Sequence, residues 1–282
     1  MTEIPLTEIQ MEERPFDLGR FSVVHKAKWC LKDVVVKVIR TLDENEYQNF
    51  MKEAEFTFRL NHQNIIDLFG ITRVKRYQFA IVMEVAEHGS LDRWIGKLER
   101  GQEIKIAMCV VNGLQYVHSQ KVMHRDIKPK NILMCGPKDD MIPKIADFGS
   151  AKISERVTRN TKIGDDHYVA PEVTQFCPYS FKADIFSLAM TMFELFNEKL
   201  IQESSEDVKR FVLSYGEIAK LPESCNVPLC LRNLILRGLN RNPDTRPTLP
   251  DYFHGKNAFS LTELTAYFSN ITAAQFSGKQ NW

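Results

Sequence analysis

The stretch that decides the fold is HRDIKPKN, residues 124–131, which gathers an aspartate, two lysines and an asparagine within eight positions. The runs NILM and PKIAD follow it as short predicted strands, joined by the turn-rich segment GPKDD. DFG, residues 147–149, and APE, residues 170–172, come next. Because Gly, Pro, Asn and Asp favour turns, we expect HRDIKPKN and DFG to lie on loops beside a rigid hairpin. Loops positioned by a rigid scaffold are typical places for binding and catalytic side chains.

Upstream of this stretch the pattern favours a sheet. The runs VVHKAKW, DVVVKVI and YQFAIVM are rich in β-branched and aromatic residues and predict strands. Between them apolar residues recur at helical spacing and predict one amphipathic helix. Its apolar positions are Tyr47, Phe50, Met51, Ala54 and Phe58.

Downstream of residue 91 helical periodicity dominates. Ile106, Val110, Leu114 and Val117 mark one amphipathic helix. The segment 183–196 is apolar on nearly every side, which is typical of a buried helix. The sequence therefore predicts an α+β protein, with a small sheet-rich part that carries one helix and a larger helical part.

Charge and composition exclude some kinds of partner. The 282 residues include 37 basic and 36 acidic side chains, for a net charge of +1, and 44% of them are hydrophobic. That apolar fraction suffices for one large core or two smaller ones. No overall field draws the molecule to nucleic acid, so we expect no nucleic-acid partner, and a charged partner must meet a local patch.

The cysteines and the N-terminus bear on the compartment. The six cysteines include no Cys-x-x-Cys pair, and the spacing of Cys225 and Cys230 has no second pair to complete a metal site. Free buried thiols suit a reducing compartment. The N-terminus has no basic region followed by an apolar stretch, and no run is long enough to cross a bilayer. We expect a protein of the cytoplasm or the nucleus.

HRDIKPKN, DFG and APE, in this order, resemble the signature of eukaryotic protein kinases, and the resemblance extends over residues 16–249. DFG or APE alone would be typical of an ordinary turn. The resemblance implies a bilobal fold, with an extension at residues 1–15, an N-lobe at 16–86 and a C-lobe at 87–282. It also implies that ATP and Mg²⁺ are the cofactors and that a protein is the substrate.

The resemblance assigns a phosphate-binding lysine. Lys37, in VVVKVI, stands at the position of the family's strand lysine, which holds the α- and β-phosphates. A strand lysine taken alone would be a solvated outward charge. Glu53 stands at the position of the helix glutamate that pairs with this lysine. Glu55 is a competing candidate, but its offset from LNHQNII does not fit the family.

The catalytic loop supplies the reacting groups that the resemblance implies. Asp126 would orient the substrate hydroxyl and accept its proton, because a carboxylate can bond the attacking group while it stays ionised. Lys128 would neutralise the γ-phosphate during transfer. Asn131 and Asp147 would supply oxygen ligands for Mg²⁺, which favours hard oxygen donors.

The base-binding residues rest on the resemblance alone, because aliphatic residues are core in any fold. The segment Glu84, Val85 and Ala86 would link the lobes and bond adenine through its backbone, with Met83 before it as core filler that also borders the pocket. Three aliphatic residues would sandwich the base, namely Val24, Ala27 and Leu133.

Further residues are expected to be structural. Glu172 resembles the glutamate that forms a buried ion pair with a late arginine, and NPDTRP places Arg246 in that role. Asp184 matches the aspartate that holds the backbone of the catalytic loop. His124 is expected to buttress this loop. Arg125 could either pair with a phosphate in the activation segment or brace that segment.

The sequence departs from the family in two places. The phosphate-covering loop DLGRFSVV keeps Gly19, but Asp17 and Ser22 stand at the other two glycine positions unless the loop is shortened. Glycines there let backbone amides approach phosphate, so we expect weakened nucleotide binding. Asp165 stands where threonine is common; it could pair with Lys128, but it would crowd Asp126 with like charge.

Lys128 favours serine and threonine over tyrosine as phosphate acceptors. MEVAEHGSLDRWI, KIADFGSAK and the segment 231–249 are similar to leucine-rich repeat kinases of the Roco type, in the tyrosine-kinase-like branch. A regulatory protein partner is a further expectation, since two apolar patches in residues 257–282 could cap the helical lobe or dock another protein.

Two other readings compete with an active protein kinase. A pseudokinase scaffold would explain Asp165 and the missing glycines. It has no chemical need for the full set of retained residues, namely Lys37, Glu53, Asp126, Asn131 and Asp147. A small-molecule kinase of related fold would not need APE or the NPDTRP tail.

Overall fold

The computed structural model describes residues 2–18, 22–39, 51, 55, 57–75, 78–148, 152–153, 156–157, 167–175, 177–201 and 229–252. The chain divides into two compact units. The first combines Met1–Gly89 with Leu133–Gly149, and the second combines Ser90–Ile132 with Ser150–Trp282. Each unit is described by itself.

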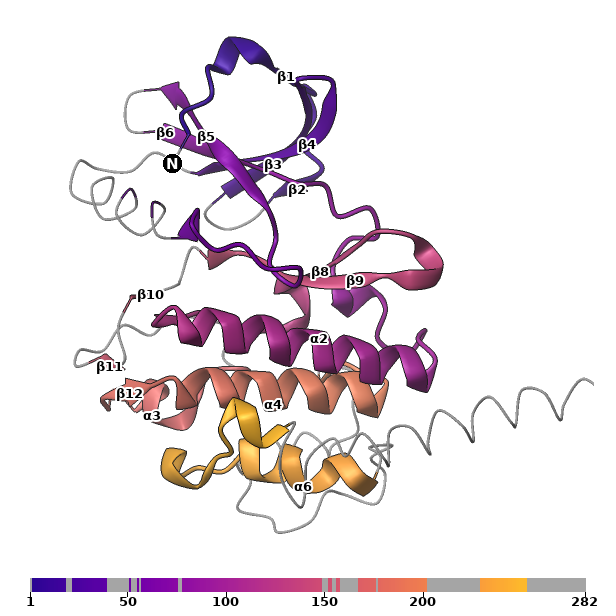
Figure 1. Cartoon of the computed structure of the whole chain (residues 1–282), viewed down its shortest axis with the longest axis vertical. Coiled ribbons are helices and arrows are strands. Elements are labelled where there is room, and N and C mark those ends of the chain that lie inside the picture. The colour runs from indigo at the N-terminus through magenta and orange to yellow at the C-terminus, as the bar shows by residue number, and fades with distance from the viewer. Residues whose placement is uncertain are drawn as a thin grey trace, which may run out of the picture. The chain divides into compact units, whose positions relative to one another are not determined.

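A curled antiparallel sheet forms the first unit (Figure 1). The strand order is β1-β3-β4-β6-β5, and β2 also pairs with β3. The strands are β1 (Ile9–Met11), β2 (Asp17–Leu18), β3 (Ser22–Trp29), β4 (Lys32–Ile39), β5 (Leu68–Lys75) and β6 (Gln78–Met83). The three predicted strand runs match β3, β4 and β6, whereas β1 and β5 were not predicted.

One face of this sheet is covered by residues 2–11, which we call the N-terminal strap. The strap contains the 3-10 helix η1 (Leu6–Glu8) and the strand β1. Its start bonds to β5, where the Ile4 amide donates to the Ile71 carbonyl at 2.7 Å, and its end pairs with β3. It therefore joins both edges of the sheet. Two strap side chains complete a buried cluster, which consists of Ile4, Ile9, Ala27, Val34, Val36, Ala80 and Val82.

A close approach explains why β5 carries a glycine. A Cβ atom on Gly70 would lie 2.6 Å from the carbonyl oxygen of Thr2 and 2.7 Å from Cδ1 of Ile4. Only a residue without a side chain admits the strap at this point. The same glycine interrupts the β-type pattern of LFGITRVK, which is why this strand escaped prediction.

The first unit also contains a separate hairpin of two strands, β8 (Ile132–Cys135) and β9 (Ile142–Ile145). The 3-10 helix η4 (Lys138–Asp140) lies between these strands. This is the hairpin predicted from NILM and PKIAD. A parallel bridge between Ile65 and Ile145 connects it to the chain before β5. Asp147 lies two residues after the end of β9, so this hairpin positions it.

Helices form most of the second unit. α2 (Arg100–Ser119) and α4 (Lys182–Asn197) lie side by side, and α6 (Leu229–Gly238) packs on α4 (Figure 1). A capping box between Glu99 and Gln102 begins α2, and the four apolar positions predicted for this helix are all buried. In α4 every residue after Lys182 is buried, as the apolar pattern predicted.

The remaining elements of the second unit are short. Two-stranded sheets pair β7 (Val122–Met123) with β10 (Lys152–Ile153), and β11 (Arg156–Val157) with β12 (Tyr179–Ser180). The other helices are η2 (Leu91–Arg93), η3 (Pro129–Asn131), α3 (Pro171–Thr174), η7 (Pro243–Thr245) and η8 (Leu249–Tyr252).

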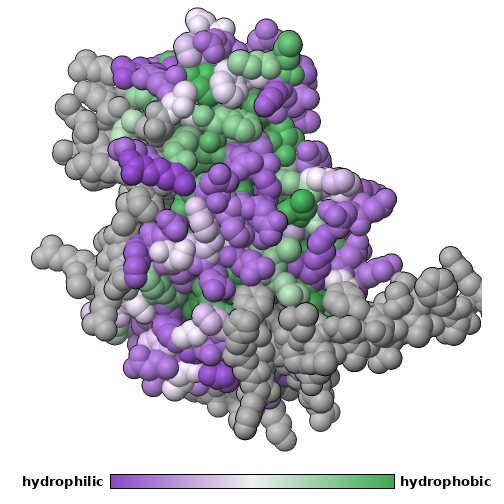
Figure 2. All heavy atoms as spheres, viewed as in Figure 1, coloured by the Kyte–Doolittle hydropathy of each residue, from purple (hydrophilic) through white to green (hydrophobic). Residues whose placement is uncertain are grey.

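The surface and the helices show two general properties. Figure 2 shows hydrophilic residues over much of one face, with hydrophobic residues exposed in smaller groups. Among the residues that the structure describes, no helix combines the length and the apolar character that crossing a bilayer requires.

Candidate active site

A buried carboxylate accepts hydrogen bonds from the backbone of the loop between β7 and β8. Asp184, at the start of α4, is 1% exposed and accepts the backbone amides of His124 at 2.9 Å and Arg125 at 2.8 Å. His118 Nε2 lies 2.8 Å from the same carboxylate. Burial alone would raise the pKa of Asp184, but His118, His124 and the Arg125 amide outweigh it, so the pKa is lowered. Asp184 is thus placed as a structural residue.

This anchor fixes a strained loop backbone. Arg125 has a φ of +67°, a conformation that is unfavourable for an arginine. His124 is fully buried, and its Nδ1 accepts the Asp126 amide at 3.3 Å. The histidine therefore buttresses the loop, as expected. The side chain of Arg125 lies 3.4 Å from the hydroxyl of Tyr179, which favours a bracing role.

The loop holds the carboxylate of Asp126 by one oxygen only. Oδ2 accepts Nδ2 of Asn131 at 2.8 Å and lies 3.0 Å from Nζ of Lys128. Oδ1 is buried and has no hydrogen-bond partner among the described residues. A buried carboxylate oxygen without a donor is costly, so this position favours a group that can donate a hydrogen bond.

Asn131 is oriented by the same loop. Its Nδ2 donates to the backbone carbonyl of Asp126 at 2.7 Å as well as to the Asp126 carboxylate. Two acceptors at the amide nitrogen settle which end of the side chain is which. The Asn131 Oδ1 atom is therefore left as an acceptor, as a magnesium ligand must be.

The first unit holds the lysine that is expected to bind phosphate and the second expected magnesium ligand. Lys37 Nζ lies 2.5 Å from Oδ1 of Asp147, and their side chains are 18% and 41% exposed. Asp147 has a φ of +63°, which turns the chain sharply after β9. Lys37 is therefore not the free solvated charge that a strand lysine would be by default.

Glu53, the expected partner of Lys37, lies outside the described residues, as do Gly19 and Asp165. The competing candidate Glu55 is described, and its carboxylate pairs with Arg59 Nη2 at 2.9 Å with both side chains exposed. Glu55 is thus a surface charge.

The strand register supports the shortened form of the phosphate-covering loop. Leu18 pairs with Val23 and Asp17 pairs with Val24, so only residues 19–22 separate the paired positions. Asp17 and Ser22 belong to the strands themselves and do not replace glycines within a longer loop.

The register also tests the apolar residues assigned to the base. Val24 pairs directly with Lys37, so the two side chains share a face of the sheet. Ala27 pairs with Val34 and packs in the cluster beneath the N-terminal strap. Its assignment to the base-binding sandwich is therefore wrong, because an odd offset of three residues turns it to the opposite face. Val35 shares the face of Lys37 and pairs with Met83, and sequence reasoning missed it.

Three of the remaining base-binding candidates lie together in the first unit. Met83, Ala86 and Leu133 pack against a second buried cluster. The cluster consists of Ile66, Cys135 and Ala146. Burial, followed by nearby carboxylates, raises the pKa of the Cys135 thiol to about 12, so this cysteine is a core residue and not a nucleophile. Glu84 follows Met83 directly.

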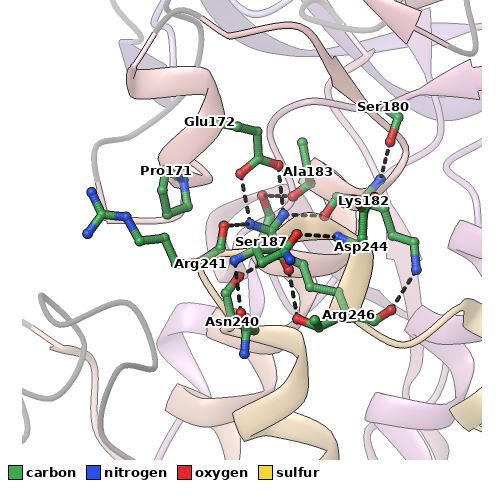
Figure 3. A network of polar contacts seen from close by, with 12 residues as sticks. Pro171, Glu172, Ser180, Lys182, Ala183, Ser187, Asn240, Arg241, Asp244 and Arg246 are labelled. Atoms are coloured by element: carbon green, nitrogen blue, oxygen red, sulfur yellow. Dashed lines mark hydrogen bonds and ion pairs between the residues drawn. The ribbon is translucent and has the colours of Figure 1, made fainter.

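The second unit also contains the predicted structural ion pair (Figure 3). Arg246 Nη1 and Nη2 lie 2.7 Å from Oε1 and Oε2 of Glu172, a two-pronged contact. The Arg246 guanidinium also lies over the ring of Phe186 at 5.2 Å. Phe186 therefore contributes an aromatic face to this ion pair.

The family model described as protein kinase domain matches residues 16–256. The chain belongs to the protein kinase domain family. Family membership implies the use of ATP, generally with Mg²⁺, and a protein substrate.

Individual kinases are similar to this protein kinase domain at moderate identity. Human mitogen-activated protein kinase kinase kinase 7 is 31% identical over 277 residues, which are 94% of this chain and 43% of that protein. A probable serine/threonine-protein kinase of Clostridium acetobutylicum is 31% identical over 83% of this chain and 37% of its own length. A viral protein named as a serine/threonine-protein kinase/receptor, from Acanthamoeba polyphaga mimivirus, is 32% identical over 86% of this chain and 15% of its own.

This protein kinase domain thus spans less than half the length of these relatives. The similarity to leucine-rich repeat kinases of the Roco type stays a prediction.

Proposed function

We propose that this chain is an active serine/threonine protein kinase. The observation that carries the proposal is the carboxylate of Asp126, which is held at Oδ2 by Lys128 and Asn131 and has a buried Oδ1 without a partner. A substrate hydroxyl can donate to this oxygen. Asp126 then orients the hydroxyl and takes up its proton while the hydroxyl oxygen bonds to the γ-phosphorus and ADP leaves.

Membership in the protein kinase family supports assigning the remaining site residues of each unit to a magnesium-bound triphosphate. Asn131 Oδ1 and the Asp147 carboxylate are hard oxygen donors, and Mg²⁺ is usually held by few protein oxygens together with substrate phosphates. Lys37 would exchange Asp147 for the α- and β-phosphates. Lys128 would balance charge on the transferred group. When bound, ATP supplies the phosphoryl group and Mg²⁺ neutralises its charge.

Two observations support serine and threonine as acceptors. Lys128 lies within the catalytic loop at 3.0 Å from Asp126, in the pattern expected of this class. Two of the three relatives described above carry names of serine/threonine-protein kinases. A pseudokinase would have no chemical use for the Asp126, Lys128 and Asn131 arrangement.

The test is transfer of labelled phosphate from ATP with Mg²⁺ to a generic protein, followed by phosphoamino-acid analysis. Asp126→Asn and Asp147→Asn should each lower the rate by a factor on the order of 100 or more. Asp139→Asn, an exposed carboxylate on η4, is the matched control and should leave the rate unchanged. Equal label in wild type and Asp147→Asn, or label on tyrosine alone, contradicts the proposal.

A further inference from the structure

Lys144 on β9 is a partly buried lysine that the proposed chemistry does not use. Its side chain is 12% exposed, and its Nζ lies 2.5 Å from Oε1 of Glu84 and 3.5 Å from Oδ2 of Asp67. Burial, the largest influence, lowers the pKa of Lys144, but Glu84 and Asp67 together outweigh burial and the pKa is raised. Lys144 is therefore a charged residue with a fixed pair of partners.

The contacts of Glu84 fix the beginning of the segment after β6. Oε1 of Glu84 also accepts the Asp67 amide at 2.6 Å, and the Glu84 amide donates to the Asp67 carbonyl at 3.0 Å. The side chain and the backbone amide of Glu84 are thus both engaged, and among the described residues Lys144 supplies the charge-assisted contact to its carboxylate. The Glu84 carbonyl remains as an acceptor.

The same hairpin fixes the end of that segment. The His88 amide donates to the Met134 carbonyl at 3.1 Å, and the Met134 amide donates to the Gly89 carbonyl at 2.8 Å. Met134 lies on β8 and Lys144 on β9. The β8–β9 hairpin therefore holds residues 84–89 at both ends, and it also carries Asp147.

We propose that Lys144 is a positioning residue for the adenine base, acting through Glu84 to hold the backbone of residues 84–86 in its base-binding conformation. This inference rests on the proposed function. The Ala86 amide and the Glu84 carbonyl make no hydrogen bond within the described part of the chain. A rigidly held amide donor and carbonyl acceptor two residues apart can hydrogen-bond the edge of a base. If this backbone is less rigid, affinity and selectivity for the base decrease.

The experiment compares Lys144→Met with Lys144→Arg and with Lys138→Met, an exposed lysine of the same hairpin. In Lys144→Met, KM for ATP should rise roughly five- to tenfold while kcat stays within about twofold of wild type. The preference for ATP over GTP, measured as the ratio of kcat/KM values, should fall. Lys144→Arg should restore most of both, and Lys138→Met should match wild type.

A purely structural role of Lys144 predicts a different result. It would lower the fraction of active enzyme, and so kcat for both nucleotides, without changing the ATP to GTP ratio. An unchanged KM and ratio in a folded Lys144→Met protein, checked by thermal unfolding, overturns the inference.

Two further arms keep the outcome decisive. If Lys144→Met does not fold, Glu84→Gln removes the charge while keeping an acceptor for the Asp67 amide, and it should raise KM for ATP in the same way. Equilibrium binding of ATP with Mg²⁺ to the wild type tests the proposed function separately. If the wild type neither binds ATP nor transfers phosphate, the proposed function is wrong. If the wild type is active but Lys144→Met changes neither KM for ATP nor the ATP to GTP ratio, only the inference about Lys144 is wrong.

Discussion

Arg246 is 2% exposed, and all of its donors find acceptors. Nε donates to the Asn240 carbonyl, Nη1 to Glu172 and the Lys182 carbonyl, and Nη2 to Glu172 and the Arg241 carbonyl. A guanidinium has five N–H groups, so none is left without a partner. Replacing both charged residues of a buried ion pair by apolar residues is often neutral for stability. Removing only one of them leaves the other charge buried without a partner, which is strongly destabilising.

Glu172→Gln should therefore lower the free energy of unfolding by about 3 to 5 kcal/mol. The neutral amide would place an N–H group against the donors of Arg246. Urea unfolding, read as the midpoint at a constant slope, measures the loss.

The matched control is an exposed ion pair of the same chain. Lys28 and Asp33 lie 2.8 Å apart with side chains 60% and 75% exposed, so Asp33→Asn should cost no more than about 1 kcal/mol. Similar midpoints for the two variants would mean that the buried pair has no special role.

Glu103, near the start of α2, gives the stability a pH dependence. Its side chain is 1% exposed, with Oε2 at 2.6 Å from Nη1 of Arg100 and Oε1 buried without a described partner. Burial raises the pKa of Glu103 from 4.5 to about 7, with Arg100 opposing and Glu198 adding to the shift. Between these pH values the folded chain binds a proton that the unfolded chain does not.

The stabilising contribution of Glu103 is thus fully present below pH 4.5 and is lost as the pH rises to about 7. The loss is on the order of 3 kcal/mol. Glu103→Gln should remove this part of the dependence, so wild type and variant should diverge between pH 5 and pH 8 in their free energies of unfolding. Parallel pH profiles would contradict the assignment.

At the scale of elements, the N-terminal strap was not predictable from its own residues. Residues 2–11 carry few β-type signals, and their place depends on partners outside the segment, in β3 16 to 20 positions away and at Ile71 67 positions from Ile4. By contrast α2 and α4 carry their periodicity within one segment, and both were predicted. A periodic pattern within one segment thus predicts an element with a buried face. The position of the N-terminal strap depends instead on contacts with other segments, which no local pattern shows.

Gly70→Ala tests the seating of the strap. Since the new Cβ would meet the Thr2 carbonyl at 2.6 Å, the backbone must shift, and we expect a loss of about 1 to 3 kcal/mol in the free energy of unfolding.

A shortened chain that lacks residues 1–8 supplies the control for Gly70→Ala. Without Thr2 and Ile4 there is nothing to collide with, so the substitution should cost much less there than in the full chain. Equal costs in the two backgrounds would show that the glycine serves another purpose.

At the scale of the whole molecule, the motifs predicted the α+β class, the family and the loop that carries Asp126, because spacing within a motif survives without knowledge of the rest of the chain. The prediction that two side chains of β3 share one face of the sheet was wrong. Val24 and Ala27 look alike in sequence, but the pairing of β3 with β4 separates them. The role of Lys144 was also missed, since its partners Glu84 and Asp67 lie 60 and 77 positions away.

The N-terminal strap has a practical consequence for anyone who divides this chain. Similarity to the kinase family begins at residue 16, whereas Ile4 and Ile9 already belong to the buried cluster of the first unit. A fragment begun at residue 16 would leave Val34, Val36 and Val82 bare on a sheet face, a surface that invites aggregation. The border of an alignment and the border of a folding unit are different places here.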